Sequence, residues 1–183
     1  VPDSNLLDLS SGMTLEAWVY PTAILGNWRS VLLKGGPNGM AYGLYAANDL
    51  LMPAGEFMNA PLGWYSASGI LVLPLNTWSH LATTFDGSVL RMYVNGIQVG
   101  SRATTGALNS STSPLEIGAN SVWGEYFAGR IDNVRVYNRA LPQTELIANM
   151  LRPVQSAPEY CNVATSAMVR ECRFAYITRA GVE

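Results

Sequence analysis

The sequence predicts an all-β protein, a sandwich of two antiparallel sheets with one short helix that follows the last strand. Short runs rich in β-branched and aromatic residues recur along the chain, and turns rich in glycine and proline separate them. Asp86-Gly87 and Asn95-Gly96 each join two alternating runs directly, which is typical of tight β-hairpins. Strands do not alternate with long helices, so doubly wound and barrel α/β folds are excluded.

The ends of the predicted strands coincide with residues that break a β-ladder. Met13–Tyr20 ends at Pro21, which has no amide hydrogen to donate. Gly63–Leu73 is either one strand or two strands that meet at Gly69. The other predicted strands are Ser30–Lys34, Met40–Ala47, Gly55–Asn59, Trp78–Phe85, Val89–Val94, Ile97–Ser101, Pro114–Ala119 and Phe127–Arg139.

The helix is predicted at Pro142–Leu151. Pro142 suits the first helical position, Glu145 places an acid in the first turn, and Leu146, Ile147 and Met150 recur at helical spacing.

The last predicted strand poses a question about Asp132. Strict alternation places Asp132, Val134 and Val136 on one face, with Ile131, Asn133, Arg135 and Tyr137 on the other. The two valines indicate that the first face is the core face. Because an unpaired buried charge is very costly, Asp132 then needs a partner.

Composition narrows the possible partners. The 183 residues are 49% hydrophobic and only 13% charged, which is typical of an ordered β-rich protein. The formal net charge is -2 and the eleven Lys and Arg form no cluster, so we do not expect a nucleic-acid partner. No apolar run approaches the ~20 residues of a membrane-spanning helix, so we expect no membrane insertion.

Three motifs then occur in a known order. They are M-T-L-E-A-W-V-Y-P from Met13, W-S-H-L-A-T-T-F-D-G-S-V-L-R-M-Y-V-N-G from Trp78, and P-L-E-I-G from Pro114 followed by F-A-G-R-I-D-N-V-R-V-Y-N-R-A-L-P-Q-T-E-L from Phe127. Together they resemble the laminin-G-like jelly-roll domain of the concanavalin A-like lectin and glucanase group, over residues 1–151. The resemblance implies a jelly roll of two curved sheets, with the helix packed beside the last strand.

The resemblance also implies a function class and a metal. Members are mostly non-catalytic modules of secreted or cell-surface proteins that bind carbohydrate, bind protein or act as spacers. Many carry a structural calcium, and the acid that helps to hold it corresponds to Asp132. From the residues themselves, Asp132 could equally bond backbone amides or pair with Arg130 or Arg135. The family's usual first strand, which contains Phe-Asp-Gly and contributes to the calcium site, does not precede Pro2 in this sequence, so we expect Asp132 to supply only part of such a site.

Catalysis finds little support in the sequence. Glucanases of this group need two acids at E-x-D-x-x-E or E-x-D-x-E spacing, and no two acids here have it. The chain has one histidine, His80, and no G-x-S-x-G motif. We therefore expect no enzymatic activity.

Two surfaces are candidates for ligand binding. The first is a sheet face with His80, Arg91 and Tyr93 beside Glu16, Trp18 and Tyr20, where rings could stack on sugars and polar groups meet hydroxyls. The alternative for this face is ordinary packing.

The second candidate surface is a set of aromatic residues on loops: Trp28, Trp64, Tyr65, Trp123 and Tyr126. Aromatic residues on loops often lie at the surface, and Trp123 is expected to be the most exposed. Its alternative is burial under neighbouring loops.

Residues 152–183 form a linker and a tail of unknown structure, in which Cys161 and Cys172 are either a disulfide or two free thiols. We conclude from the sequence that this is a binding module of a secreted or surface protein, with a glycan as partner. The alternatives are a structural or protein–protein adhesion module with an extracellular protein as partner, and, less favoured, an atypical glycoside hydrolase.

Overall fold

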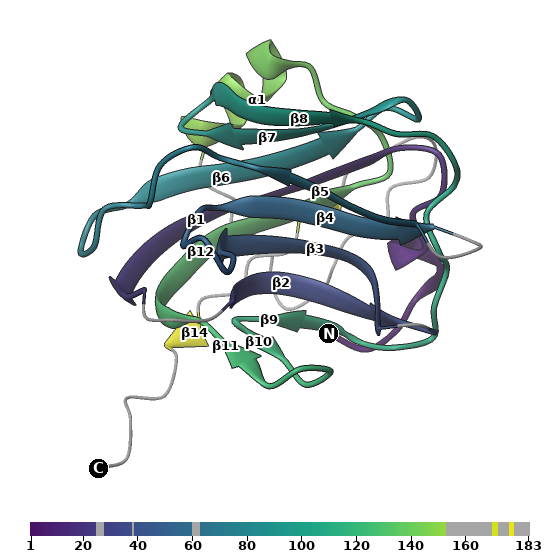
Figure 1. The fold of residues 1–183 in the computed structure, drawn as a ribbon, viewed down its shortest axis with the longest axis horizontal. Helices are drawn as coiled ribbons and strands as arrows, with labels where there is room; N and C mark the ends of the chain where they lie inside the picture. Colours follow the sequence, from purple (N-terminus) through teal and green to yellow (C-terminus); the bar gives the residue numbers. More distant parts are fainter. Residues whose placement is uncertain (25–27, 38, 60–62, 153–169, 172–175, 178–183) are drawn as a thin grey trace.

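The computed structural model describes residues 1–24, 28–37, 39–59, 63–152, 170–171 and 176–177. Within these ranges the strands form two antiparallel sheets that face each other and a separate small hairpin (Figure 1). Sheet I has the order β13-β12-β1-β6-β7-β8, with β14 also pairing with β12, and sheet II has the order β5-β4-β3-β2-β9. The predicted two-sheet sandwich is confirmed.

The strands of sheet I are β1 (Met13–Ala23), β6 (Ser79–Phe85), β7 (Val89–Val94), β8 (Ile97–Ala103), β12 (Ala128–Tyr137), β13 (Arg170–Glu171) and β14 (Tyr176–Ile177). Those of sheet II are β2 (Arg29–Gly36), β3 (Gly39–Ala47), β4 (Ala54–Asn59), β5 (Gly63–Ser68) and β9 (Leu115–Ile117). The hairpin consists of β10 (Ala119–Asn120) and β11 (Glu125–Tyr126). A 3-10 turn, η1 (Asn5–Leu7), precedes β1, and the helix α1 (Gln143–Met150) follows β12.

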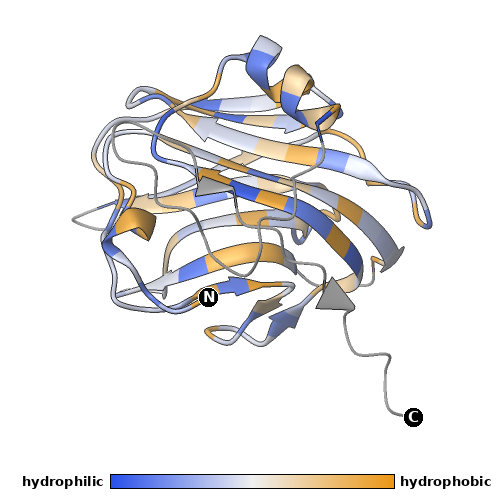
Figure 2. Cartoon of the chain, turned by 180° about the vertical axis from the view of Figure 1, so that it is seen from behind, coloured by the Kyte–Doolittle hydropathy of each residue, from blue (hydrophilic) through white to orange (hydrophobic). Residues whose placement is uncertain are grey.

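The core lies between the two sheets because alternate strand residues point inward from each. In Figure 2 the strands carry alternating hydrophobic and hydrophilic bands, as this arrangement requires. Leu15 and Val19 of β1 and Leu44 of β3 are fully buried in the same cluster. Phe57 of sheet II meets Phe85 of sheet I with ring centroids 4.5 Å apart.

The sheets approach each other closely where β4 crosses β6. A Cβ added to Gly55 would lie 2.0 Å from Oγ1 of Thr83, so only glycine fits at this position. Thr83 Oγ1 donates a hydrogen bond to the carbonyl of Arg91 at 2.9 Å, which satisfies this buried hydroxyl.

Val134 and Val136 face the core as predicted, but the prediction was wrong for Ile131 and Asp132, because β12 contains a bulge. Asn133 has a φ of 53°, and the pairing of β1 with β12 shifts between Glu16 and Trp18. The extra residue reverses the alternation, so that Ile131 and Val134 both enter the core. Asp132 therefore lies on the outer face of sheet I and is only half-buried.

Helix α1 packs on this outer face. Leu146 is fully buried in a cluster with Leu141, Tyr137, Tyr93 and Ala82. None of the helices in the described residues is long and apolar enough to cross a membrane.

A buried polar network lies at the same place. Glu16 Oε1 accepts hydrogen bonds from Asn149 Nδ2 of α1 at 2.9 Å and from the hydroxyl of Tyr137 at 3.2 Å, and pairs with Arg135 at 3.4 Å. Arg135 in turn donates to the carbonyls of Asn149 and Arg152. Sheet and helix are thus joined by a network around one buried carboxyl group.

The outer edge of β12 receives two short segments from beyond the helix. Arg170 and Glu171 pair with Val136 and Arg135, and residues 176–177 pair with residues 130–131. The rest of the predicted linker and tail, including Cys161 and Cys172, lies outside the described residues.

Candidate functional site

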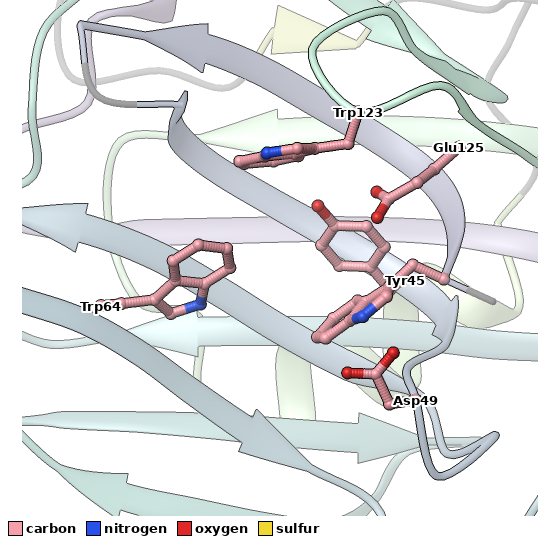
Figure 3. Close-up of a pocket in the computed structure, with 6 residues that line it drawn as sticks. Tyr45, Asp49, Trp64, Trp123 and Glu125 are labelled. Carbon is pink, nitrogen blue, oxygen red and sulfur yellow. The ribbon is translucent and has the colours of Figure 1, made fainter.

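Four aromatic and two acidic side chains line a cavity of about 380 Å³ over the outer face of sheet II (Figure 3). Tyr45 comes from β3, Trp64 from β5, and Trp28 directly precedes β2. Asp49 lies in the turn after β3, while Trp123 and Glu125 belong to the β10–β11 hairpin. Residues distant in sequence thus meet because the hairpin lies over sheet II.

The aromatic rings form the walls of this cavity. The rings of Trp64 and Trp123 have centroids 5.6 Å apart and are inclined by 34°. Trp28 contacts Tyr45 edge-on, with centroids 4.8 Å apart. Trp64 is 45% exposed and Trp123 41% exposed, whereas Tyr45 is buried. Two indole rings are therefore accessible to a ligand, supported below by a packed pair.

The hairpin fixes the position of Trp123. Asn120 Oδ1 accepts the amide hydrogens of Val122 at 3.0 Å and Trp123 at 3.3 Å, and its Nδ2 donates to Glu125 Oε2 at 2.7 Å. Gly124 closes the turn with a φ of 72°, a conformation that glycine adopts without strain. Trp123 is therefore held in position by a local hydrogen-bond network and not by a deep pocket around its ring.

Gly39 allows the indole of Trp123 to approach sheet II. A Cβ at this position would lie 2.6 Å from Cζ2 of Trp123. Any other residue would push the ring away from β3.

Burial changes the ionisation of the acidic groups near the cavity. Glu56 of β4 is almost fully buried, and this burial raises the pKa of its carboxyl group to about 7, although hydrogen bonds from Ser66 and Trp64 oppose the shift. Burial also raises the pKa of Glu125, and the negative charge of Asp49 adds to the effect. Burial, with the charges of Glu125 and Glu56, raises the pKa of the Tyr45 hydroxyl. The cavity is therefore a partly desolvated, acidic environment.

The predicted loop set is brought together in part. Trp28, Trp64 and Trp123 line one cavity. Tyr65 follows Trp64 within β5, so it points to the opposite side, into the sandwich, and stacks on Phe57 at 5.3 Å. Tyr126 is 60% exposed but is not among the residues that line the cavity.

The predicted sheet face is covered rather than open. His80 and Tyr93 are buried on the outer face of sheet I, where Tyr93 packs in the cluster with Leu146 of α1. Arg91 is half-buried and paired with Asp86 at 2.5 Å. The structure thus corrects the expectation of an accessible ligand surface at these three residues; ordinary packing, the alternative considered, fits this face.

Asp132 has a local partner. Its Oδ1 accepts the amide hydrogen of Asn133 at 2.7 Å, within the β12 bulge. In the described part of the chain, no group of three or more Asp, Glu, His or Cys side chains is placed to hold a metal ion. Calcium takes six to eight oxygen ligands, and the described acids do not assemble such a set around Asp132. Calcium binding there stays a prediction.

Sequence reasoning missed Tyr45, Asp49, Glu56 and Glu125. Tyr45 lies in a strand between the core residues Leu44 and Ala46, and it points to the other face, where it packs against Trp28. Asp49 and Glu125 are placed by the turn and the hairpin. Asn120 ahead of Gly124 was the one available signal, because both residues favour tight turns.

The fold and the cavity define a β-sandwich with an aromatic cleft, and comparison with protein families gives its class. The family model of the concanavalin A-like lectin/glucanases superfamily, in its laminin-G-like form, matches residues 1–147. The chain belongs to this superfamily.

Solved structures share the fold. Domain 4 of AbnA, an extracellular arabinanase from Geobacillus stearothermophilus solved with arabinotriose, is 22% identical, with a TM-score of 0.62 over 81% of this chain and 70% of that chain. A putative carbohydrate binding protein from Bacteroides ovatus is 21% identical, with a TM-score of 0.66 over 90% of this chain and 45% of that chain. At these identities the likeness shows the fold alone.

Curated relatives match over short stretches only. Glutamine--fructose-6-phosphate aminotransferase of Bordetella parapertussis is 91% identical over 23 residues, which are 13% of this chain and 4% of the enzyme. Mouse Pappalysin-1 is 30% identical over 78 residues, which are 40% of this chain and 5% of that protein. The chain thus spans a small fraction of the length of these proteins.

Proposed function

We propose that this chain is a non-catalytic carbohydrate-binding module and that the cavity lined by Trp64 and Trp123 receives the glycan. The observation that carries the proposal is the pair of half-exposed indole rings, which contact each other and line a cavity whose rim contains carboxylates. Sugars present apolar C–H faces that stack on aromatic rings, and hydroxyl groups that need hydrogen-bond acceptors.

The carboxylates suit the second requirement. Asp49 is exposed at the rim, and Glu125 uses one oxygen, Oε2, to accept from Asn120. Ionised carboxyl groups are strong acceptors that can orient sugar hydroxyls. The architecture shared with domain 4 of AbnA, a structure solved with arabinotriose, supports the proposal at the level of the fold. We extend the proposal to a secreted or cell-surface location.

A glycoside hydrolase is the second candidate, because Asp49, Glu56 and Glu125 lie around one cavity and the pKa of Glu56 is raised to about 7. Glu56 is, however, almost fully buried, and its Oε2 accepts the indole hydrogen of Trp64 at 3.0 Å. A general acid must reach the glycosidic oxygen, and Glu56 lacks that access. Binding without cleavage is the better-supported function.

The test measures binding of arabino-, xylo-, cello- and chito-oligosaccharides by isothermal titration calorimetry. We expect at least one of these glycans to bind, and Trp64→Ala and Trp123→Ala each to weaken its binding tenfold or more. Trp78→Ala is the matched control, because Trp78 is also half-exposed but packs against Tyr20 on sheet I. Circular dichroism establishes that all three variants fold.

The alternatives have different outcomes in the same experiment. If no glycan binds to the wild-type chain, or if the two cleft variants bind as tightly as the Trp78 variant, the carbohydrate proposal fails and an adhesion module becomes the better interpretation. Release of shorter oligosaccharides during prolonged incubation would instead show a hydrolase.

A further inference from the structure

The charges around the cleft are of one sign. Of the described residues that line the cavity, Asp49 and Glu125 are acidic and none is basic. A third acid, Glu56, lies beneath Trp64 and bonds its indole nitrogen. The guanidinium of Arg29, which follows Trp28, is directed to the carbonyl of Tyr126 at 3.2 Å. A ligand in the cavity therefore meets negative charge.

The aromatic walls favour the same sign of ligand. Indole and phenol rings carry negative electrostatic potential on their faces and attract cations, and tryptophan is the strongest of them. Four such rings, Trp28, Tyr45, Trp64 and Trp123, surround the cavity. Several rings combined with carboxylates form the kind of enclosure that binds ammonium groups.

Building on the carbohydrate-binding function proposed above, we propose that the glycan carries a protonated amine, as an amino sugar without its N-acetyl group does. The sugar ring stacks against Trp64 or Trp123, while the ammonium group lies between the aromatic walls and the carboxylates of Asp49 and Glu125. An acidic sugar would bring a carboxylate against two others, and like charges at short range repel.

A neutral sugar would leave the acidic groups without a counter-charge. Burial already disfavours the ionised form of Glu125 and raises its pKa. An ammonium beside this carboxylate reverses that effect and favours ionisation. An ammonium group therefore offsets the cost of keeping Glu125 ionised, whereas a neutral sugar does not.

The test compares three tetrasaccharides of similar size: β-1,4-linked glucosamine, its fully N-acetylated form, and cellotetraose. Calorimetry at about pH 6 keeps the primary amines protonated. We expect the glucosamine oligomer to bind at least tenfold more tightly than either neutral oligomer, with the preference shrinking as salt is raised.

The variant Asp49→Asn/Glu125→Gln removes both charges and keeps an oxygen that can accept from Asn120. We expect it to lose the preference for the amine and to retain the weaker binding of cellotetraose. Glu145→Gln is the matched control, because Glu145 lies on α1 and pairs with Arg139. This control keeps the preference.

The outcomes separate the two proposals. Equal affinity for the charged and neutral oligomers overturns the amine inference and leaves the carbohydrate-binding function standing. A preference that survives in the double variant also overturns it, because the carboxylates are then not its source. If none of the oligosaccharides, including those of the broader panel, binds at all, both proposals fall.

Discussion

The indole nitrogen of Trp64 donates a hydrogen bond to Oε2 of Glu56 at 3.0 Å, so that an accessible wall of the cleft is fastened to a buried carboxyl group. This contact links an exposed ring of the module to a buried group, Glu56, that can ionise. The pKa of Glu56 is raised by burial to about 7, and the pKa of Glu16, which is buried beneath α1, is also raised to about 7.

Stability should therefore fall as the pH rises from 6.5 to 8. Both groups have a folded-state pKa above the unfolded value of 4.5, so the folded chain holds protons that the unfolded chain has released. The stabilisation is fully present below the unfolded pKa and is lost as the pH passes through the folded pKa. Over this interval the ionisation of each group lowers the free energy of unfolding by about 1 kcal/mol. Urea unfolding at several pH values measures the slope.

Glu56→Gln provides the comparison, since the amide cannot ionise and keeps an oxygen for Trp64. We expect roughly half of the slope to disappear. His80, whose pKa is lowered by burial from 6.5 to about 4, partly opposes the trend between pH 6.5 and about 7.5, because half of the unfolded chains still carry its proton at pH 6.5. An unchanged slope in the variant would show that Glu56 does not titrate here.

Arg135→Met should be strongly destabilising. It removes the cation that pairs with the fully buried Glu16 and the donor to the carbonyls of Asn149 and Arg152. Breaking a buried ion pair at one partner costs about 3–5 kcal/mol. Because Glu16 can take up a proton, the loss measured by urea unfolding should be larger at pH 8 than at pH 5.5. The double variant Glu16→Leu/Arg135→Met should recover part of the stability. A single variant as stable as the wild type at pH 8 would contradict this role.

Asn133→Gly should be more stable than Asn133→Ala. Both variants lose the amide side chain, so their difference isolates the backbone at a φ of 53°. Alanine is strained by about 1 kcal/mol in this left-handed region, whereas glycine is not. Thermal or urea unfolding of the pair measures the difference. Equal stability of the two variants would mean that the β12 bulge is not formed as described.

Gly55→Ala should destabilise the sandwich by about 1–3 kcal/mol or more, because its Cβ would collide with Thr83 between the sheets. Gly124→Ala, in the hairpin, is the control. A Cβ there meets nothing within 4 Å, so the variant carries only the strain of a φ of 72°, about 1 kcal/mol. Chemical denaturation compares the free energies of unfolding of the two variants. A smaller loss of stability in Gly55→Ala than in Gly124→Ala would argue against this close approach of the sheets.

The strands and the helix could be predicted because their signals are local. Asp86-Gly87 and Asn95-Gly96 mark turns whatever packs around them, whereas Pro21 does not end its strand as predicted, since β1 continues to Ala23 and Pro21 pairs with Gly129. The face of the sheet to which a side chain points could not be predicted as well, since one bulge reverses the alternation. Alternation counted from Val134 and Val136 placed Asp132 on the core face, and the left-handed backbone of Asn133 moves it to the outer face.

The cleft could be predicted only in part, because it depends on contacts between segments that are distant in the sequence. Trp28, Trp64 and Trp123 were recognisable as aromatic residues outside the expected core. Nothing local indicates that the hairpin of Trp123 lies over the strand of Trp64, because this contact depends on the arrangement of the complete sheet. The outer face of sheet I was misjudged because coverage by α1 is a tertiary effect that strand periodicity does not encode.

The inclination of the two cleft indoles limits the physical form of a polysaccharide that the module can engage. The rings of Trp64 and Trp123 face each other across an interval of 5.6 Å rather than lying side by side in one plane (Figure 3). A flat crystalline surface touches several rings at once only when they are coplanar, so such a surface could not contact both. A single chain detached from its neighbours can bend to follow the angle between the two rings. We therefore expect the module to retain soluble or amorphous polymer and to pass over the crystalline form of the same polymer.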